Sequence, residues 1–210
     1  MIIPPYKIMS EFSGSLTEQS YREIGAEFAE KFSPHINQGD RVLEVGCGCA
    51  RIAQSLSNVV YEGFDVSKEA IDWCKSLNLP NLNFQWLDSY NSHYNSSGKH
   101  GLVVFPYDDA SFDFVYLTSV FTHVMPDVVL NYISEIQRVL KAGKACAATF
   151  FIIKDGQRGT EWKWHNHGRC WVVYPDNPDA IVGYEEPFVR SLMPVEAIIP
   201  SFQDMVVYRT

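Results

Sequence analysis

The chain has 210 residues, of which 46% are hydrophobic and 20% are charged, and its 17 Lys and Arg against 25 Asp and Glu give a formal net charge of −8. This length predicts a single domain over residues 1–210. The acidic balance disfavours binding to nucleic acids or anionic membranes. No apolar run reaches the roughly 18 residues of a membrane span, and the first ten residues show no secretory pattern. Five cysteines without a C-x-x-C pair indicate a reduced, cytoplasmic protein without structural zinc.

Hydrophobic periodicity and capping residues predict helices and strands that alternate along the chain. Helices are expected from a start at Thr17 or Ser15 to residue 32, over 51–57, over 67–77, and from Pro126 to about Gly143. Strands are expected over 41–45, 59–65, 82–87, 112–117, 144–153, 195–199 and 203–208. This alternation is typical of an α/β protein with a doubly wound, mostly parallel sheet, in which ligands bind at the carboxyl ends of the strands.

A glycine-containing turn, Gly46-Cys47-Gly48, follows the first predicted strand. Dinucleotide-binding loops of this kind place a third glycine where this chain has Arg51. A carboxylate just before the loop, Glu44, opposes a pyrophosphate and suits a cationic ligand. Asp65 ends the second strand, where it can accept hydrogen bonds from a ribose diol, and Asp88 ends the third, where it can accept from an adenine amine. Three carboxylates at successive strand ends fit an adenosine that carries a positive charge.

Four segments together resemble the successive motifs of class I S-adenosylmethionine-dependent methyltransferases: 44–50, 63–67, Asp88 and 111–115. The resemblance covers about residues 39–153. It implies a Rossmann-like sheet of seven strands with helices on both faces, the last strand antiparallel, and S-adenosylmethionine as cofactor. The cofactor-binding residues that we predict are Glu44, Gly46, Cys47, Gly48, Asp65, Val66, Asp88, Ser89 and Thr118. The chain departs from the family at Ala50, where glycine is usual.

Several of these residues also have a structural interpretation. Glu44 could be a surface residue of its strand, Asp65 could start a helix, and a neighbouring polar group could replace Asp88 at the adenine. Asp113 is expected to be a structural turn residue. Cys47 is expected to pack, as is Cys49, because no general base stands near them in the sequence.

The fourth predicted strand runs into Leu117-Thr118-Ser119-Val120-Phe121-Thr122-His123, which places one titratable side chain, His123, beyond the strand. An imidazole ordinarily titrates near pH 6.5, which suits a general base. A buried or capping role for His123 is the alternative. Metal-assisted chemistry is not expected, because no carboxylate follows until Asp127 and His165-x-His167 lacks an evident third ligand.

Residues 154–190 have the most unusual composition and are interpreted as a lid over an acceptor. Three of the five tryptophans, Trp162, Trp164 and Trp171, fall within ten residues. Aromatic faces among polar donors suit a hydroxylated ring. The alternatives are a lid packed by its own aromatic residues and a dimer contact. The predicted substrate-binding residues are Ser119, Trp162, Trp164, His165, Arg169 and Tyr184.

Within the superfamily, segments 117–123, 71–74 and 201–204 resemble a subgroup associated with glycan and polysaccharide biosynthesis. This resemblance implies transfer to a sugar hydroxyl, in a small-molecule or oligosaccharide acceptor. The chain is shorter than the subgroup between Arg190 and Val195. Two alternatives remain open: a methyltransferase for a small phenol, carboxylate or amine, and a binding module for S-adenosylmethionine without catalysis.

Overall fold

The computed structural model describes residues 1–159 and 161–210, and the chain forms two compact units. Unit 1 comprises residues 1–101 and 112–114, and unit 2 comprises residues 102–111 and 115–210. Strand β4 (Phe112–Leu117) contributes its first half to unit 1 and its second half to unit 2.

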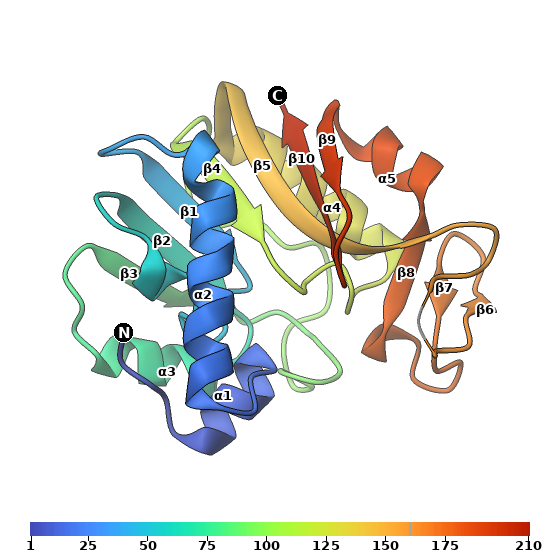
Figure 1. Cartoon of the computed structure of the whole chain (residues 1–210), viewed down its shortest axis with the longest axis horizontal. Coiled ribbons are helices and arrows are strands. Elements are labelled where there is room, and N and C mark those ends of the chain that lie inside the picture. The colour runs from blue at the N-terminus through green and yellow to red at the C-terminus, as the bar shows by residue number, and fades with distance from the viewer. Residues whose placement is uncertain (160) are drawn as a thin grey trace. The chain divides into compact units, whose positions relative to one another are not determined.

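Unit 1 is built on the parallel strands β1 (Arg41–Val45), β2 (Val60–Asp65) and β3 (Leu82–Trp86), in the order β3-β2-β1. Val45 pairs with Phe64, and Asp65 pairs with Trp86, so the carboxyl ends of the three strands lie at one edge of the sheet. The helices are α1 (Tyr6–Ser13), α2 (Glu18–Phe32) and α3 (Lys68–Ser76), with 3-10 turns η1 (Ser33–His35) and η2 (Ala53–Ser55). In Figure 1, α1 lies beyond the carboxyl end of β1.

Two helices of unit 1 begin at capping side chains. Thr17 accepts the backbone N–H of Ser20 at 3.1 Å, and Ser20 bonds back to Thr17, which forms a capping box for α2. The Ser67 hydroxyl accepts the N–H of Ala70 at 3.2 Å and starts α3 directly after β2. These local contacts explain why both helix starts were predictable.

Unit 2 is organised around the long strand β5 (Leu140–Ile153), which changes partner along its length. Residues 145–150 pair antiparallel with β10 (Asp204–Arg209), and residues 151–153 pair parallel with β8 (Val182–Glu185). Strand β9 (Val195–Ile199) pairs with β10, while β6 (His165–Asn166) and β7 (Trp171–Val172) extend from β8 (Figure 1). The helices are α4 (Pro126–Val139), α5 (Glu186–Leu192) and the 3-10 turn η3 (Pro178–Ala180).

The predicted fold class is confirmed: the protein is a mixed α/β, Rossmann-like fold with mostly parallel strands and a final antiparallel strand. Asp113 has the expected structural role, because its carboxylate accepts the backbone N–H of Arg41 at 3.1 Å, but it lies within β4 rather than in a turn. Short strands β6, β7 and β8 add to the seven that the sequence predicted.

Two predicted elements were wrong in detail. The helix expected over 51–57 is instead a series of turns followed by the three-residue η2. Helix α4 ends at Val139 rather than near Gly143, and β5 begins at the next residue. Gly143, with φ of 73°, lies inside β5 rather than at the end of the helix. Helices α1 and α5 were not predicted, and within the described residues no helix is long and apolar enough to cross a membrane.

Candidate functional site

The first backbone N–H groups of the loop after β1 donate hydrogen bonds to the end of β2. The N–H groups of Gly46 and Cys47 both donate to the carbonyl oxygen of Phe64, at 2.9 and 3.0 Å. The N–H of Gly48 donates to Oδ2 of Asp65 at 2.8 Å. Gly46 and Gly48 have φ of 72° and 48°, which glycine adopts without a Cβ penalty. The loop is therefore held in one conformation by β2.

Helix α1 approaches this loop closely. A Cβ added at Gly48 would lie 2.2 Å from the carbonyl oxygen of Phe12, so no larger residue fits there. The Tyr21 hydroxyl donates to the carbonyl oxygen of Cys49 at 2.6 Å. Ala50 has φ of 61° and is fully buried, so the departure from the usual glycine leaves a left-handed backbone with a methyl group on it.

Two carboxylates lie at the carboxyl ends of β1 and β2. Glu44 is only 3% exposed, and its Oε2 accepts the Tyr61 hydroxyl at 2.6 Å, so it is not the surface residue of the alternative interpretation. Oδ1 of Asp65 accepts the N–H of Ser67 at 2.7 Å. Burial raises the pKa of the Asp65 carboxyl, against the lowering effect of its backbone donors.

Asp88 follows β3 and is tied to the loop after it. Its Oδ1 accepts the amide of Asn95 at 3.4 Å, and its Oδ2 lies 3.5 Å from Nζ of Lys99. The carbonyl oxygen of Ser89 accepts the same Asn95 amide at 3.1 Å. Asp88 and Ser89, both predicted cofactor-binding residues, are partly exposed and share Asn95 as a hydrogen-bond partner.

Three aromatic residues of unit 1 near these groups were not among the predicted site residues. Trp86, at the end of β3, donates from Nε1 to the carbonyl oxygen of Val66 at 3.0 Å. The rings of Phe12 and Tyr94 lie 6.1 Å apart, and desolvation followed by the charge of Asp65 raises the pKa of Tyr94. The position of Trp86 at a strand end could have indicated that it lies near the predicted site, but no local pattern links Phe12 or Tyr94 to the glycine loop.

In unit 2, the residues after β4 carry several predicted site groups. Thr118 is partly buried, and Ser119 is exposed with φ of 57°. The N–H of Ser119 donates to Oγ1 of Thr149 at 2.7 Å, and its hydroxyl donates to Oε1 of Gln203 at 2.9 Å. Nδ1 of His123 lies 2.7 Å from the carbonyl oxygen of Ala180.

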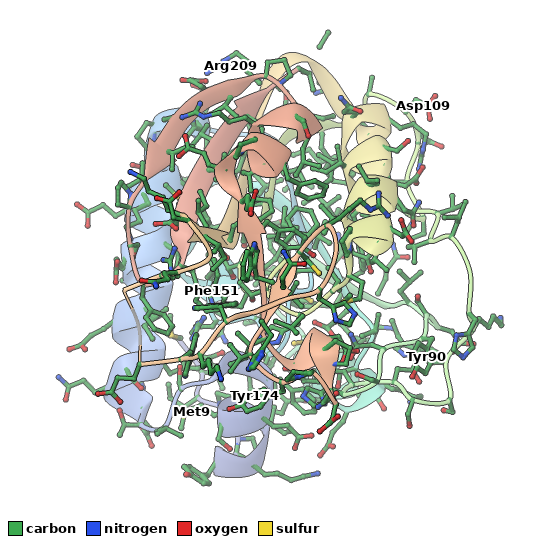
Figure 2. All side chains as sticks on the ribbon, turned by 90° about the vertical axis from the view of Figure 1, so that its right-hand side faces the viewer. Met9, Tyr90, Asp109, Phe151, Tyr174 and Arg209 are labelled. Atoms are coloured by element: carbon green, nitrogen blue, oxygen red, sulfur yellow. The ribbon has the colours of Figure 1, made fainter. Side chains whose placement is uncertain are left out.

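The aromatic residues of the predicted lid pack largely on one another. Trp164 is 8% exposed and forms a cluster with Phe151 and Ile153, against which Trp162 also packs; Phe151 is labelled in Figure 2. The Trp162 and Phe202 rings lie 5.9 Å apart. This packing favours the self-packed alternative for these tryptophans.

The remaining predicted substrate-binding residues differ in accessibility. Tyr184 is fully buried and its hydroxyl donates to the carbonyl oxygen of Val124, which gives it a structural position rather than one at a ligand. Arg169 is exposed but forms an ion pair with Asp127. His165 is partly buried in β6. Among the described residues, no three His, Cys, Asp or Glu side chains gather as metal ligands.

The loop of unit 1 is poorly arranged for a diphosphate. The amides of Gly46, Cys47 and Gly48 already donate within the protein, and the following 3-10 turn has only three residues, so no helix N-terminus is presented to an anion. The carboxylates of Glu44 and Asp65 add negative charge at the same strand ends. This arrangement favours an uncharged or cationic ligand with hydroxyl donors.

Comparisons with known proteins agree with this geometry. The profile of a family described as a methyltransferase domain matches residues 43–148, half of the chain. The chain belongs to this methyltransferase family. Similar solved structures include a SAM-dependent methyltransferase from Methanosarcina mazei, with 16% identity and a TM-score of 0.60 over 84% of this chain and 95% of that one. A protein from Pyrococcus horikoshii has 15% sequence identity and a TM-score of 0.66, over 97% of this chain and 97% of that one. A SAM-dependent methyltransferase from Aquifex aeolicus has 15% sequence identity and a TM-score of 0.55, over 92% of this chain and 98% of that one. At these identities the likeness shows the fold.

The methyltransferase uses S-adenosylmethionine as its cofactor, and the residues of unit 1 fit this molecule. Its sulfonium and amino groups are cationic, which suits the buried acidic side chain of Glu44. Its ribose carries two hydroxyl donors, and each oxygen of the Asp65 carboxylate retains acceptor capacity beside its one backbone bond. The backbone N–H groups of Gly46, Cys47 and Gly48 already have acceptors within the protein, so they need no phosphate group as a partner.

The close approach of Phe12 can be tested with two glycines of similar backbone conformation. Gly48 has φ of 48° and the Phe12 carbonyl beside it, whereas Gly14, with φ of 64°, has no atom within 4 Å of an added Cβ. Gly14→Ala should cost about 1 kcal/mol of unfolding free energy from backbone strain alone. Gly48→Ala should cost roughly 1–3 kcal/mol more, because α1 or the loop must move.

Urea denaturation of both variants measures this difference, and calorimetry with S-adenosylhomocysteine shows whether the displaced loop still binds. Equal destabilisation by the two substitutions would contradict the contact between α1 and the loop.

Proposed function

We propose that this methyltransferase transfers the methyl group of S-adenosylmethionine to a sugar hydroxyl, in a glycan or a smaller sugar, with His123 as the general base. The observation that carries the proposal is the 2.7 Å contact between Nδ1 of His123 and the carbonyl oxygen of Ala180. Each residue role below is part of this proposal.

The contact with Ala180 selects one tautomer of the His123 ring. A carbonyl oxygen can only accept a hydrogen bond, so Nδ1 carries the hydrogen. In the neutral ring Nε2 is then the nitrogen with a lone pair, which is the form that can take a proton from a hydroxyl. The same contact stabilises the ring after it has become protonated, because the carbonyl dipole faces the positive charge. Both effects support a general base.

The groups around Ser119 are polar and uncharged. Oε1 of Gln203 accepts hydrogen bonds from the Ser119 hydroxyl at 2.9 Å and from the Thr149 hydroxyl at 2.8 Å. Because its oxygen is occupied, Gln203 offers its amide N–H groups as donors. The three arginines of the predicted lid are ion paired, Arg158 with Asp204, Arg169 with Asp127 and Arg190 with Glu186. This pattern supports a neutral hydroxyl acceptor over a carboxylate.

S-adenosylmethionine supplies a methyl group on a sulfonium, which leaves as neutral S-adenosylhomocysteine. In the proposal, Glu44 binds the amino end, Asp65 accepts from the ribose hydroxyls, and Asp88 accepts from the adenine amine. Gly46, Cys47 and Gly48 let the chain pass close to the methionine portion, while Val66, Ser89 and Thr118 complete the contacts. His123 removes the hydroxyl proton as the new bond forms.

Release of S-adenosylhomocysteine that depends on an added acceptor tests the proposal. Deoxysugar-containing oligosaccharides and simple glycosides form one panel, and catechols, carboxylates and amines form the other. Turnover with the first panel supports a sugar acceptor, and turnover with the second panel alone favours a small-metabolite enzyme. Cofactor binding with no turnover on either panel favours the non-catalytic module.

The position of Asp65 predicts a pH-dependent affinity for S-adenosylhomocysteine. The ionised carboxylate accepts ribose hydroxyls better than the neutral acid, and burial raises the pKa of this group. Affinity should therefore be full at high pH and fall as the pH drops through this raised pKa, above the range in which an ordinary aspartate titrates.

Calorimetry across pH measures this effect, and Asp65→Asn is the control. The variant should bind roughly 1.5–3 kcal/mol more weakly and show a flat profile over the same range. A wild-type profile as flat as that of the variant would remove Asp65 from the ribose.

Removal of the imidazole tests the proposed base. His123→Ala should lower kcat by roughly 10²–10⁴-fold and leave the dissociation constant of S-adenosylhomocysteine nearly unchanged, because the residue acts on the acceptor. The exposed His167, replaced by alanine, serves as a control for the loss of a histidine. Wild-type kcat in His123→Ala would exclude the residue from the chemistry.

A further inference from the structure

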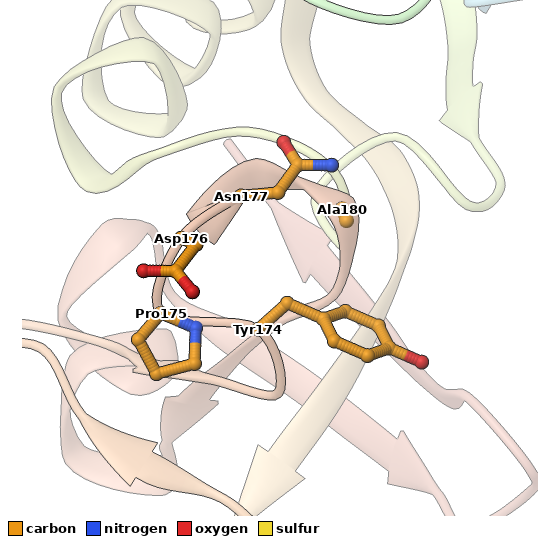
Figure 3. A pocket seen from close by; sticks show the side chains of 5 residues that line it. All are labelled: Tyr174, Pro175, Asp176, Asn177 and Ala180. Atoms are coloured by element: carbon orange, nitrogen blue, oxygen red, sulfur yellow. The ribbon is translucent and has the colours of Figure 1, made fainter.

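A pocket of about 410 Å³ lies in unit 2, lined by Tyr174, Pro175, Asp176, Asn177 and Ala180 (Figure 3). Its size is within the roughly 300–1,000 Å³ of small-ligand pockets. None of the residues predicted from the sequence to bind substrate lines it. We propose that this pocket is the subsite that holds a sugar ring of the acceptor, with Tyr174 as its stacking surface. This inference rests on the proposed function.

Two hydrogen bonds join the end of the loop that lines the pocket to the segment that contains the proposed base, His123. The carbonyl oxygen of Ala180 bonds to Nδ1 of His123 at 2.7 Å, and the N–H of Val182 donates to the carbonyl oxygen of Thr122 at 2.9 Å. Both bonds join the end of the pocket loop to consecutive residues beyond β4. A ligand held by this loop is thereby held in a fixed relation to the imidazole.

The loop itself is a built structure. The N–H of Asn177 donates to the carbonyl oxygen of Tyr174 at 3.0 Å, and the N–H of Ala180 donates to that of Asn177 at 3.1 Å. Across the base of the loop, the N–H of Val173 donates to the carbonyl oxygen of Ile181 at 3.2 Å. These bonds fix the backbone that carries the lining side chains before a ligand arrives, which lowers the entropy lost on binding.

The chemistry of the lining suits a hydroxylated ring. Tyr174 is 51% exposed, unlike Trp164 at 8%, so its ring is available for stacking. Among the described residues, no hydrogen bond or ion pair engages the side chains of Asp176 or Asn177, and Figure 3 shows the Asn177 amide and the Tyr174 ring on either side of Ala180. One carboxylate and one amide offer acceptors and donors for hydroxyl groups beside an aromatic face.

The experiment is a binding titration that needs no catalysis. Saturation-transfer NMR with methyl α-L-rhamnoside and methyl β-D-glucoside should detect binding to the wild-type protein. Tyr174→Ala should weaken binding by about tenfold, Tyr174→Phe should keep most of it, and Asp176→Asn should lose a few-fold. Tyr6→Ala, which removes another tyrosine that is 64% exposed, is the matched control and should bind like wild type.

Thermal unfolding confirms that each variant is folded, as expected for exposed positions. Glycoside binding that Tyr174→Ala leaves unchanged overturns the subsite, as does the absence of any glycoside signal. Arginine ethyl ester is the competing probe, and binding of this cation alone, sensitive to salt and to Asp176→Asn, overturns it as well.

The outcomes for the subsite and for the proposed function can be separated. Glycosides that bind through Tyr174 but are never methylated support the subsite and contradict the proposed function. Sugars that are methylated equally well by wild type and by Tyr174→Ala contradict the subsite and leave the proposed function standing.

Discussion

The conformation of the loop after β1 depends on the bond between the Gly48 amide and the Asp65 carboxylate. This bond and the two amides on the Phe64 carbonyl tie the end of β1 to the end of β2. Desolvation of a carboxylate is costly, and here backbone donors offset part of that cost. Because the amides are used in this way, the loop has no anion-binding cradle, and the same residues that fix its shape also exclude a diphosphate. The proposed binding of a cationic nucleoside here is consistent with loop amides that already donate within the protein.

The parts of the fold that local sequence encodes were predictable. Thr17 and Ser67 cap their helices with contacts three residues away, and the apolar strands of the sheet are short and continuous. The conformation of the loop after β1 depends on residues distant in sequence: the Tyr21 hydroxyl on the Cys49 carbonyl and the Phe12 carbonyl beside Gly48. No pattern near residue 50 contains that information, so a helix was predicted over 51–57 where turns occur, and α1 was not predicted.

The predicted acceptor residues illustrate a different limit. Composition identified residues 154–190 as aromatic and polar, but composition does not say which rings face inward. Trp164 packs on Phe151 and Ile153 and is buried, and the Tyr184 hydroxyl is bonded in the core. A cluster of large apolar rings gives a segment as long as residues 154–190 a hydrophobic core of its own. The ring of Tyr174 is exposed. Tyr174 lies beside Pro175 in a turn, after the tryptophans on which the interpretation of this segment was based.

Several non-glycine residues of this fold have a left-handed backbone, and two of them lie beyond the carboxyl ends of β1 and β4. Ala50, in the loop after β1, and Ser119, just beyond β4, both have left-handed conformations that cost a non-glycine residue about 1–2 kcal/mol each. At Ser119 the surrounding contacts sustain the strain, because its N–H donates to Thr149 and its hydroxyl donates to Gln203. Residues held in this way cluster at ligand sites, and the carboxyl ends of parallel strands are where α/β sheets bind ligands. The strained backbone at Ser119 fixes the position of its side chain. This side chain is an exposed hydroxyl held beside the amide of Gln203.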